Sequence, residues 1–221
     1  FKAAKNIKKI YPEVSFDIVG PMEDDYKERI QSLVRNGIIY YYGYQEDVKP
    51  FIKKCDCFVL PSYHEGMANT LLECGAMGRP LITSRIHGCM EAVRDGENGY
   101  LVDVKDVKGL EEKMVEFIEL SYEEKKQMGE KSQNLIVINT VVPFLYTYGL
   151  HRSDDRMCDR AGRFLEELKA ESNHIIRSWS DAGLPVVSAA DSQALIQLQK
   201  EYCDRRKCLY CRFGYEYLRH K

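Results

Sequence analysis

The sequence predicts an α/β protein in which a doubly wound parallel sheet is followed by an all-helical segment. Through residues 1–134, short apolar stretches alternate with amphipathic ones, and parallel neighbouring strands require a helical crossover between them. From residue 135 to 221 the strand-like stretches stop and only helical patterns remain. Because 44% of the 221 residues are hydrophobic, the chain has enough apolar side chains for a packed core.

The expected elements follow one another at regular intervals. Strands are expected at VSFDIVG (14–20), IIYYYG (38–43), CDCFVLP (55–61), PLITS (80–84) and GYLVDV (99–104). Helices are expected at 1–11, 24–35, 46–54, 68–77, 107–120 and 122–133, with a short helical turn at 89–95. In the second part, helices are expected at 141–151, 155–169, 174–182, 190–202 and 208–219. Helices on both faces would bury the sheet, and ligands of such sheets bind beyond the carboxyl ends of the strands.

The overall charge argues against a polyanionic partner. The chain has 32 basic and 34 acidic residues, so no global field recruits nucleic acid or an anionic surface. A nucleic-acid partner is therefore not expected. There is also no apolar run long enough to span a membrane and no leader pattern, which predicts a cytoplasmic protein. Peripheral membrane association is left open. The first residues already follow a helical pattern, which suggests that sequence precedes Phe1.

The stretch HEGMANTLLE (64–73) carries two glutamates around a glycine turn and a helix start. The first backbone N–H groups of a helix have no intrahelical acceptor, so the amides of Asn69, Thr70 and Leu71 are candidates to hold a diphosphate. Glu73 offers two acceptor oxygens to a ribose, and Glu65 could do the same for a sugar on the other side of the phosphates. Two glutamates alone are more often a loop acid and a solvated helix residue, because short motifs recur by chance.

The context of these glutamates resembles the donor-binding C-terminal half of GT-B glycosyltransferases of the family 4 type. In that family a strand ending in Pro-Ser precedes two glutamates with seven residues between them, as in PSYHEGMANTLLE (61–73). The resemblance continues through GRPLITSRIHGCMEAVRDGENGYLV (78–102), with a Gly-x-Pro strand, a glycine loop before a short helix and an NG-x-LV strand. It covers about residues 1–133 and implies a Rossmann-like domain.

The resemblance implies a role for each matching residue. Glu65 would be the catalytic position that binds the transferred sugar, and Glu73 would bind the donor ribose. Backbone of Gly66, Met67, Ala68, Asn69, Thr70 and Leu71 would contact the sugar and phosphates. Gly88 and Cys89, with Glu91 beside them, would line the donor, and Tyr44 and Gln45 would lie in the base-contacting loop. His64 is interpreted as a neighbour of the first glutamate and not as a general base.

The implied reaction is transfer of a hexosyl group, with retention, from a nucleotide-diphosphate sugar to a glycan or lipid-linked acceptor in bacterial polysaccharide biosynthesis. A UDP-sugar is the expected donor, helix amides and a basic side chain would stabilise the leaving diphosphate, and no metal cofactor is required. The acceptor-binding half and the first strand of the donor half do not occur in residues 1–134. Activity of this chain by itself is therefore left open.

The helical part has a second resemblance and a second candidate site. Residues 139–219 resemble the C-terminal end of an uncharacterised bacterial protein family. Cys203, Cys208 and Cys211 have a C-x4-C-x2-C spacing that could ligate zinc or an iron–sulfur cluster, with Cys158 or His174 as a fourth ligand. A cysteine-ligated module beside a passive nucleotide-binding part is thus the alternative function. The other reading of these cysteines is free thiols in a helical core.

The last twenty-odd residues mix basic and aromatic side chains. Such a composition could bind single-stranded nucleic acid, but it more often belongs to a solvated helical face over an aromatic core, and the balanced overall charge favours that reading.

Overall fold

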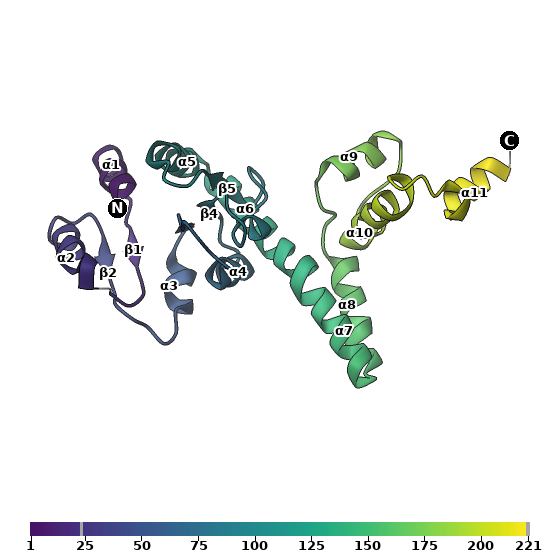
Figure 1. Ribbon diagram of the computed structural model, residues 1–221, viewed down its shortest axis with the longest axis horizontal. Coiled ribbons are helices and arrows are strands. Elements are labelled where there is room, and N and C mark those ends of the chain that lie inside the picture. The colour runs from purple at the N-terminus through teal and green to yellow at the C-terminus, as the bar shows by residue number, and fades with distance from the viewer. Residues whose placement is uncertain (23, 220–221) are drawn as a thin grey trace. The chain divides into compact units, whose positions relative to one another are not determined.

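The computed structural model describes residues 1–22 and 24–219 (Figure 1). The chain divides into two compact units, Phe1–Ile136 and Val137–Lys221, and each is described by itself. Within the described residues no helix is both long and apolar enough to cross a membrane.

The first unit contains every element that the sequence predicts for it, with shorter strands. The helices are α1 (Lys2–Ile10), α2 (Lys27–Arg35), α3 (Lys49–Lys54), α4 (Asn69–Ala76), α5 (Val107–Glu119) and α6 (Tyr122–Ile136), with 3-10 turns η1 (Asp24–Tyr26) and η2 (Met90–Ala92). The strands are β1 (Asp17–Ile18), β2 (Tyr40–Tyr41), β3 (Phe58–Leu60), β4 (Leu81–Ser84) and β5 (Gly99–Val102). Backbone hydrogen bonds continue beyond the strand ends, since the Gly20 amide donates to the Gly43 carbonyl and the Arg85 amide to the Val102 carbonyl.

The strands are all parallel, but they form two sheets where the sequence predicts one. β1 pairs with β2, and the order of the second sheet is β3-β4-β5. The amide of Tyr40 donates to the Phe16 carbonyl, so the peptide groups of Asp17 face away from β2. The amide of Phe58 donates to the Pro80 carbonyl, so β3 likewise has one edge that pairs with β4 and one that no described strand pairs with.

Both faces of β4 are buried, as a doubly wound sheet requires. Leu81 belongs to a cluster with Leu71 of α4 and Leu101, whereas its neighbour Ile82 belongs to a cluster with Ile7 of α1 and residues of α5 and α6. Successive strand residues point to opposite faces, so these two clusters are the two layers of the core. The predicted α/β architecture is therefore confirmed.

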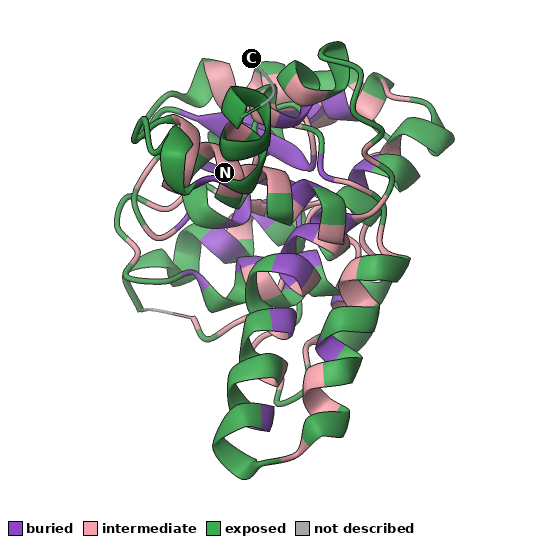
Figure 2. Cartoon of the chain, turned by 90° about the vertical axis from the view of Figure 1, so that its right-hand side faces the viewer, coloured by how far each residue is buried: buried purple, intermediate pink, exposed green. Residues whose placement is uncertain are grey.

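The two sheets share one of these core layers. Phe16 next to β1 and Val59 of β3 both pack on the cluster that contains Ile82. Burial is complete along β4 and β5 and continues on the helix faces that pack on the core, which Figure 2 shows in purple. The two sheets of the first unit are thus held together by a shared hydrophobic core and not by strand pairing.

The second unit is helical, as predicted. Its helices are α7 (Val142–Arg152), α8 (Asp155–Glu167), α9 (His174–Asp181), α10 (Ala189–Leu198) and α11 (Arg212–Arg219). Two π-helical turns, η3 (Val137–Val141) and η4 (Gln199–Cys203), and the 3-10 turn η5 (Cys208–Tyr210) complete it. Gly149 lets α7 approach α8, because a Cβ there would lie 2.8 Å from the Cys158 sulfur. A capping box between Ser188 and Asp191 begins α10.

Candidate functional site

Three loops of the first unit leave the same edge of the three-stranded sheet. Residues 61–68 follow β3, residues 85–89 follow β4 and residues 103–106 follow β5. Because the strands are parallel, these loops lie at their carboxyl ends, where open α/β sheets bind ligands. The predicted site residues from Glu65 to Glu73, and Gly88 with Cys89, all belong to this edge.

The structure brings the Glu65 loop and the Gly88 loop into direct contact. The Ala68 amide donates to the Gly88 carbonyl at 3.0 Å. A Cβ on Gly88 would lie 2.5 Å from the Glu65 carbonyl oxygen and 2.8 Å from that of Gly66, and Gly88 has φ +87°. Only a glycine fits this contact and this backbone conformation, so the two segments that the sequence singles out depend on each other sterically.

The Glu65 carboxylate is held by its own loop. The Ser62 hydroxyl donates to Glu65 Oε1 at 2.7 Å, and the Glu65 side chain is half-buried. Gly66 differs from Gly88, because no atom lies within 4 Å of an added Cβ and its φ is not positive. The fold therefore does not need a glycine at position 66, and the space over its backbone is open.

The second loop is built around a carboxylate and a buried thiol. Glu91 accepts from the Gly88 amide at 2.8 Å and pairs with His87 at 2.7 Å. The Cys89 side chain is completely buried, and this burial raises the pKa of its thiol above the ordinary value, with a hydrogen bond to Thr83 acting in the opposite direction. The Thr83 hydroxyl donates to the Leu60 carbonyl at 2.8 Å, which ties β4 to the end of β3 beneath the loops. The Cys89 side chain is part of the core, so only its backbone faces the loop.

The start of α4 differs from the prediction in its amides. No side chain caps this helix, and its Ala68 N-cap has an apolar side chain. However, the Asn69 amide donates to the Met67 carbonyl and the Leu71 amide to the Ala68 carbonyl, so the turn tightens before the helix and two of the three predicted amides are already engaged. The Thr70 amide has no acceptor among the described residues.

The side chains around this turn divide between the core and the surface. Those of Ala68 and Leu71 are buried in the core, whereas Met67 is 67% exposed. Glu73 lies one turn into the helix with an exposed side chain, which agrees with either a ligand contact or a solvated position.

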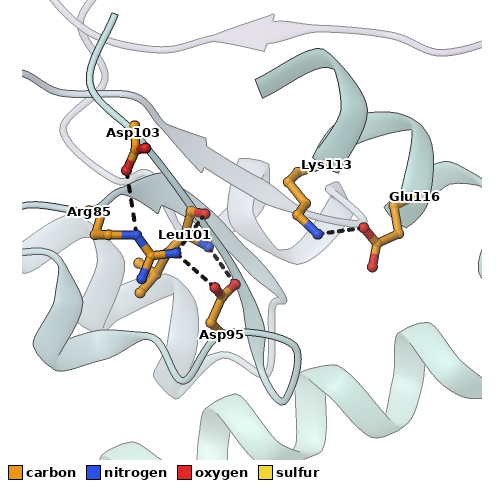
Figure 3. Close-up of polar contacts among 6 residues, drawn as sticks. All are labelled: Arg85, Asp95, Leu101, Asp103, Lys113 and Glu116. Atoms are coloured by element: carbon orange, nitrogen blue, oxygen red, sulfur yellow. Dashed lines mark hydrogen bonds and ion pairs between the residues drawn. The ribbon is translucent and has the colours of Figure 1, made fainter. Parts of the chain in front are cut away.

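The charges at this edge are mostly paired. Arg85 bonds Asp95 at 2.9 Å and approaches Asp103 at 3.5 Å, as Figure 3 shows, and the Leu101 amide donates to the same Asp95. Lys105 is different, because its Nζ lies 5.8 Å from the centre of the Tyr63 ring and no carboxylate pairs with it among the described residues. Its backbone has φ +65°, which is uncommon for a residue other than glycine.

Sequence reasoning missed Lys105, Tyr63, Ser62 and Thr83. Each follows or ends a strand at the carboxyl edge, which is a signal that could have singled them out. The left-handed backbone of Lys105 has no such signal, because residue preferences predict a glycine or an asparagine there.

Tyr44 and Gln45 lie at the carboxyl end of β2, in the other sheet. Tyr44 is 73% exposed, and Gln45 donates from Nε2 to the Tyr42 carbonyl at 2.8 Å within its own turn. Neither hydrogen-bonds to the Glu65 or Gly88 loop in the described part of the chain. Their predicted contact with a base stays a prediction.

The cysteines of the second unit do not form a ligand set. Across residues 1–22 and 24–219, no three His, Cys, Asp or Glu side chains are grouped so that they could hold a metal ion. Burial, and then the neighbouring Cys211 and Cys208, raise the pKa of Cys203 above its ordinary value. Cys211 is buried and Cys208 exposed, while Cys158 bonds the Tyr146 carbonyl at 3.6 Å. The free-thiol reading of Cys203, Cys208 and Cys211 therefore fits this geometry better than the metal reading.

The fold and the site together define an α/β ligand-binding domain of the kind that takes its ligand at the carboxyl ends of parallel strands. The sequence profile of the glycosyl transferases group 1 family matches residues 1–135, and the chain belongs to this family. A second profile, for a protein of unknown function (DUF2851), matches residues 112–174.

Curated relatives agree with this assignment. The lipopolysaccharide core biosynthesis glycosyltransferase LpsE of Rhizobium meliloti is 37% identical over 90 residues, which are 41% of this chain and 26% of LpsE. The N,N'-diacetylbacillosaminyl-diphospho-undecaprenol alpha-1,3-N-acetylgalactosaminyltransferase of Campylobacter jejuni is 30% identical over 117 residues, which are 50% of this chain and 31% of that enzyme. The chain thus spans about a quarter to a third of the length of these relatives.

Solved structures share the fold. The C-terminal domain of LpcC from Francisella tularensis superposes with a TM-score of 0.55 at 23% identity, covering 62% of this chain and 75% of that domain. HepE of Anabaena in complex with UDP superposes with a TM-score of 0.53 at 22% identity, covering 61% of this chain and 39% of HepE.

Proposed function

We propose that the first unit is the donor-binding half of a retaining glycosyltransferase that uses a nucleotide-diphosphate hexose, with a UDP-sugar as the donor. The observation that carries this proposal is the packing of the Gly88 loop on the Glu65–Gly66 backbone at the carboxyl edge of the sheet. It is supported by HepE, a protein of the same fold that was solved with UDP.

The donor would lie over the open side of Gly66. A ligand placed there has the Thr70 amide and the uncapped first turn of α4 on one side, which favour negative charge. Glu65, oriented by Ser62, would contact the transferred sugar, and the exposed Glu73 would bind the ribose hydroxyls. In this arrangement the diphosphate spans the helix start between the two glutamates.

Lys105 is proposed as the basic side chain that neutralises the departing diphosphate. Arg85 is engaged by Asp95 and Asp103, and His87 by Glu91, so neither is available as a counter-charge. Lys105 is held over Tyr63, two residues before Glu65, by a cation–π contact. A cation at a point where charge develops stabilises the transition state more than the ground state.

The acceptor would bind outside residues 1–134. We propose that residues 1–134 form the donor domain without its first strand, and the edges of β1 and β3 that no described strand pairs with support this. A partner domain would complete the cleft and hold a glycan or a lipid-linked acceptor, of which a diphospho-undecaprenol compound is named for the Campylobacter jejuni relative. Residues 135–221 would be a helical module of separate role.

The proposal is tested by isothermal titration of UDP into the purified chain and two variants. Glu73→Ala is expected to weaken binding by about tenfold to a hundredfold, because it removes hydrogen bonds to a charged acceptor. Gly66→Ala is expected to weaken binding while the fold is unaffected, since its Cβ enters only the open space. Glu130→Ala, an exposed glutamate on α6, is the matched control and should bind like the parent.

Two results would contradict the proposal. One is the absence of measurable heat for UDP, and for guanosine and adenosine diphosphates, at millimolar concentrations. The other is binding that Glu73→Ala and Glu130→Ala weaken equally.

A further inference from the structure

The last helix, α11, separates its charges from its apolar side chains. Arg212, Glu216 and Arg219 have the spacing i, i+4 and i+7, so they form one stripe of the helix. The rest of its circumference is aromatic, aliphatic or glycine: Phe213, Gly214, Tyr215, Tyr217 and Leu218. Such a helix normally covers a hydrophobic surface with the wider face.

This apolar face is exposed, contrary to the aromatic core that the sequence predicts. Leu209 and Tyr210 of η5 and Phe213, Tyr215, Tyr217 and Leu218 of α11 are between 49% and 83% exposed. The expectation failed because α11 packs on its own unit through one narrow contact. Gly214 rests on η5, where a Cβ would lie 2.4 Å from the Cys208 carbonyl oxygen, and the aromatic side chains lie on either side of this contact.

Basic side chains flank the exposed aromatic ones. Arg206 and Lys207 precede η5, and Arg212 and Arg219 lie on the charged stripe. Arg205 pairs with Glu201 at 2.9 Å, upstream of these four residues. Exposed Tyr, Phe and Leu side chains beside Arg and Lys match the surface of an anionic bilayer. There the acyl chains contact the apolar side chains and the headgroups contact the basic ones.

We propose that residues 206–219 are a membrane-surface contact that lays its aromatic face into the headgroup region of an anionic bilayer. The segment is too short for tight insertion, so binding is reversible and requires both the apolar face and the positive charge. Single-stranded nucleic acid also binds basic and aromatic side chains, but it stacks bases on separate rings. The exposed aromatic and aliphatic side chains of α11, including Leu218, together with Leu209 of η5, fit acyl chains better. This inference does not depend on the donor site.

Co-sedimentation of the whole chain with lipid vesicles tests this proposal. Vesicles of phosphatidylcholine with about a third of phosphatidylglycerol are expected to bind at least about tenfold more protein than phosphatidylcholine alone, and high salt should remove the difference. Phe213→Ser with Tyr217→Ser, and separately Arg206→Gln with Lys207→Gln, should each lower binding severalfold.

The matched control is Phe144→Ser with Tyr148→Ser. These residues are another exposed aromatic pair at i and i+4, stacked at 5.9 Å on α7. The control should bind like the parent chain. An equal loss in control and test variants would overturn the proposal, because it would mean that any exposed aromatic pair suffices.

A second readout does not depend on variants. Cys208 is the one exposed cysteine among the eight, while four others are half-buried, so it is the preferred position for an environment-sensitive fluorophore. Its emission should shift to the blue when anionic vesicles are added. No shift, or a shift that a single-stranded oligonucleotide produces and vesicles do not, would refute the membrane contact. A self-associating chain that ignores vesicles would refute it as well and would assign the face to a second copy.

Discussion

The contact between the two site loops makes Gly88→Ala the most informative change in the first unit. The new Cβ would lie 2.5 Å from the Glu65 carbonyl oxygen and 2.8 Å from that of Gly66, both backbone atoms. Backbone cannot rotate away as the end of a flexible side chain can. We therefore expect the Glu65 loop to shift, and UDP binding to be lost with it.

The expected loss of stability in Gly88→Ala has two contributions. A Cβ at φ +87° costs about 1–2 kcal/mol, as for any left-handed residue with a side chain. Overpacking against fixed backbone adds about 1–3 kcal/mol, so Gly88→Ala should lower the free energy of unfolding by about 2–5 kcal/mol. Gly96→Ala separates the parts, because Gly96 has φ +77° and no atom within 4 Å of a Cβ, so only the first cost applies. Gly66→Ala carries neither cost.

Hydrogen exchange of the β4 amides in increasing urea measures this stability in the first unit. The single tryptophan, Trp179, lies in the second unit, so its fluorescence shows whether that unit is unchanged. Equal destabilisation by Gly88→Ala and Gly96→Ala would refute the reasoning, because the loop would then move away without resistance. Destabilisation by Gly66→Ala would contradict the open space assigned above its backbone.

Two further predictions concern Lys105 and Cys74. Lys105→Gly should raise the free energy of unfolding by about 1 kcal/mol, because it removes a side chain from φ +65°, while UDP binding weakens; greater stability with unchanged binding would exclude Lys105 from the site. Burial raises the pKa of Cys74 to about 12 from 9.0, so the folded state keeps a proton that the unfolded state loses above pH 9. The free energy of unfolding, measured with urea, should therefore fall as the pH rises above about 9, and Cys74→Ala should flatten that decline. An unchanged slope in this variant would show that other groups cause the decline.

The sequence predicted the order of elements well because the apolar stretches are separated by glycine, proline and amphipathic helices. It did not predict that the strands form two sheets, because the residue pattern of one strand does not show which strand pairs with it. It also did not predict the π-helical turn η3, which precedes Pro143 at the start of α7. Proline lacks an N–H donor and disturbs the helical turn before it. Pro143 is therefore the cause of the π-helical turn, and it was visible in the sequence.

The geometry of the candidate site could be predicted where it lies in contiguous residues and not where it depends on contacts between segments. The segment from Glu65 to Glu73 was visible as a motif, and its contact with Gly88 follows from the parallel sheet. The engagement of the Asn69 and Leu71 amides was not predictable, because it depends on how the chain turns before α4. A tight turn leaves one amide available, so the proposed donor site depends more on the two glutamates and Lys105 than on the helix start.

The two units each present a surface that their own residues do not cover, and the surfaces require different partners. The edges of β1 and β3 offer backbone hydrogen-bonding groups, which only another extended strand can satisfy along their length. The face of α11 instead offers aromatic side chains next to positive charge. This combination suits a bilayer surface and does not pair with a strand. Because the chain divides into two compact units, loss of vesicle binding in the Phe213 and Tyr217 variant should leave UDP affinity unchanged. A coupled loss of both activities would show that the helical unit contributes to the donor site.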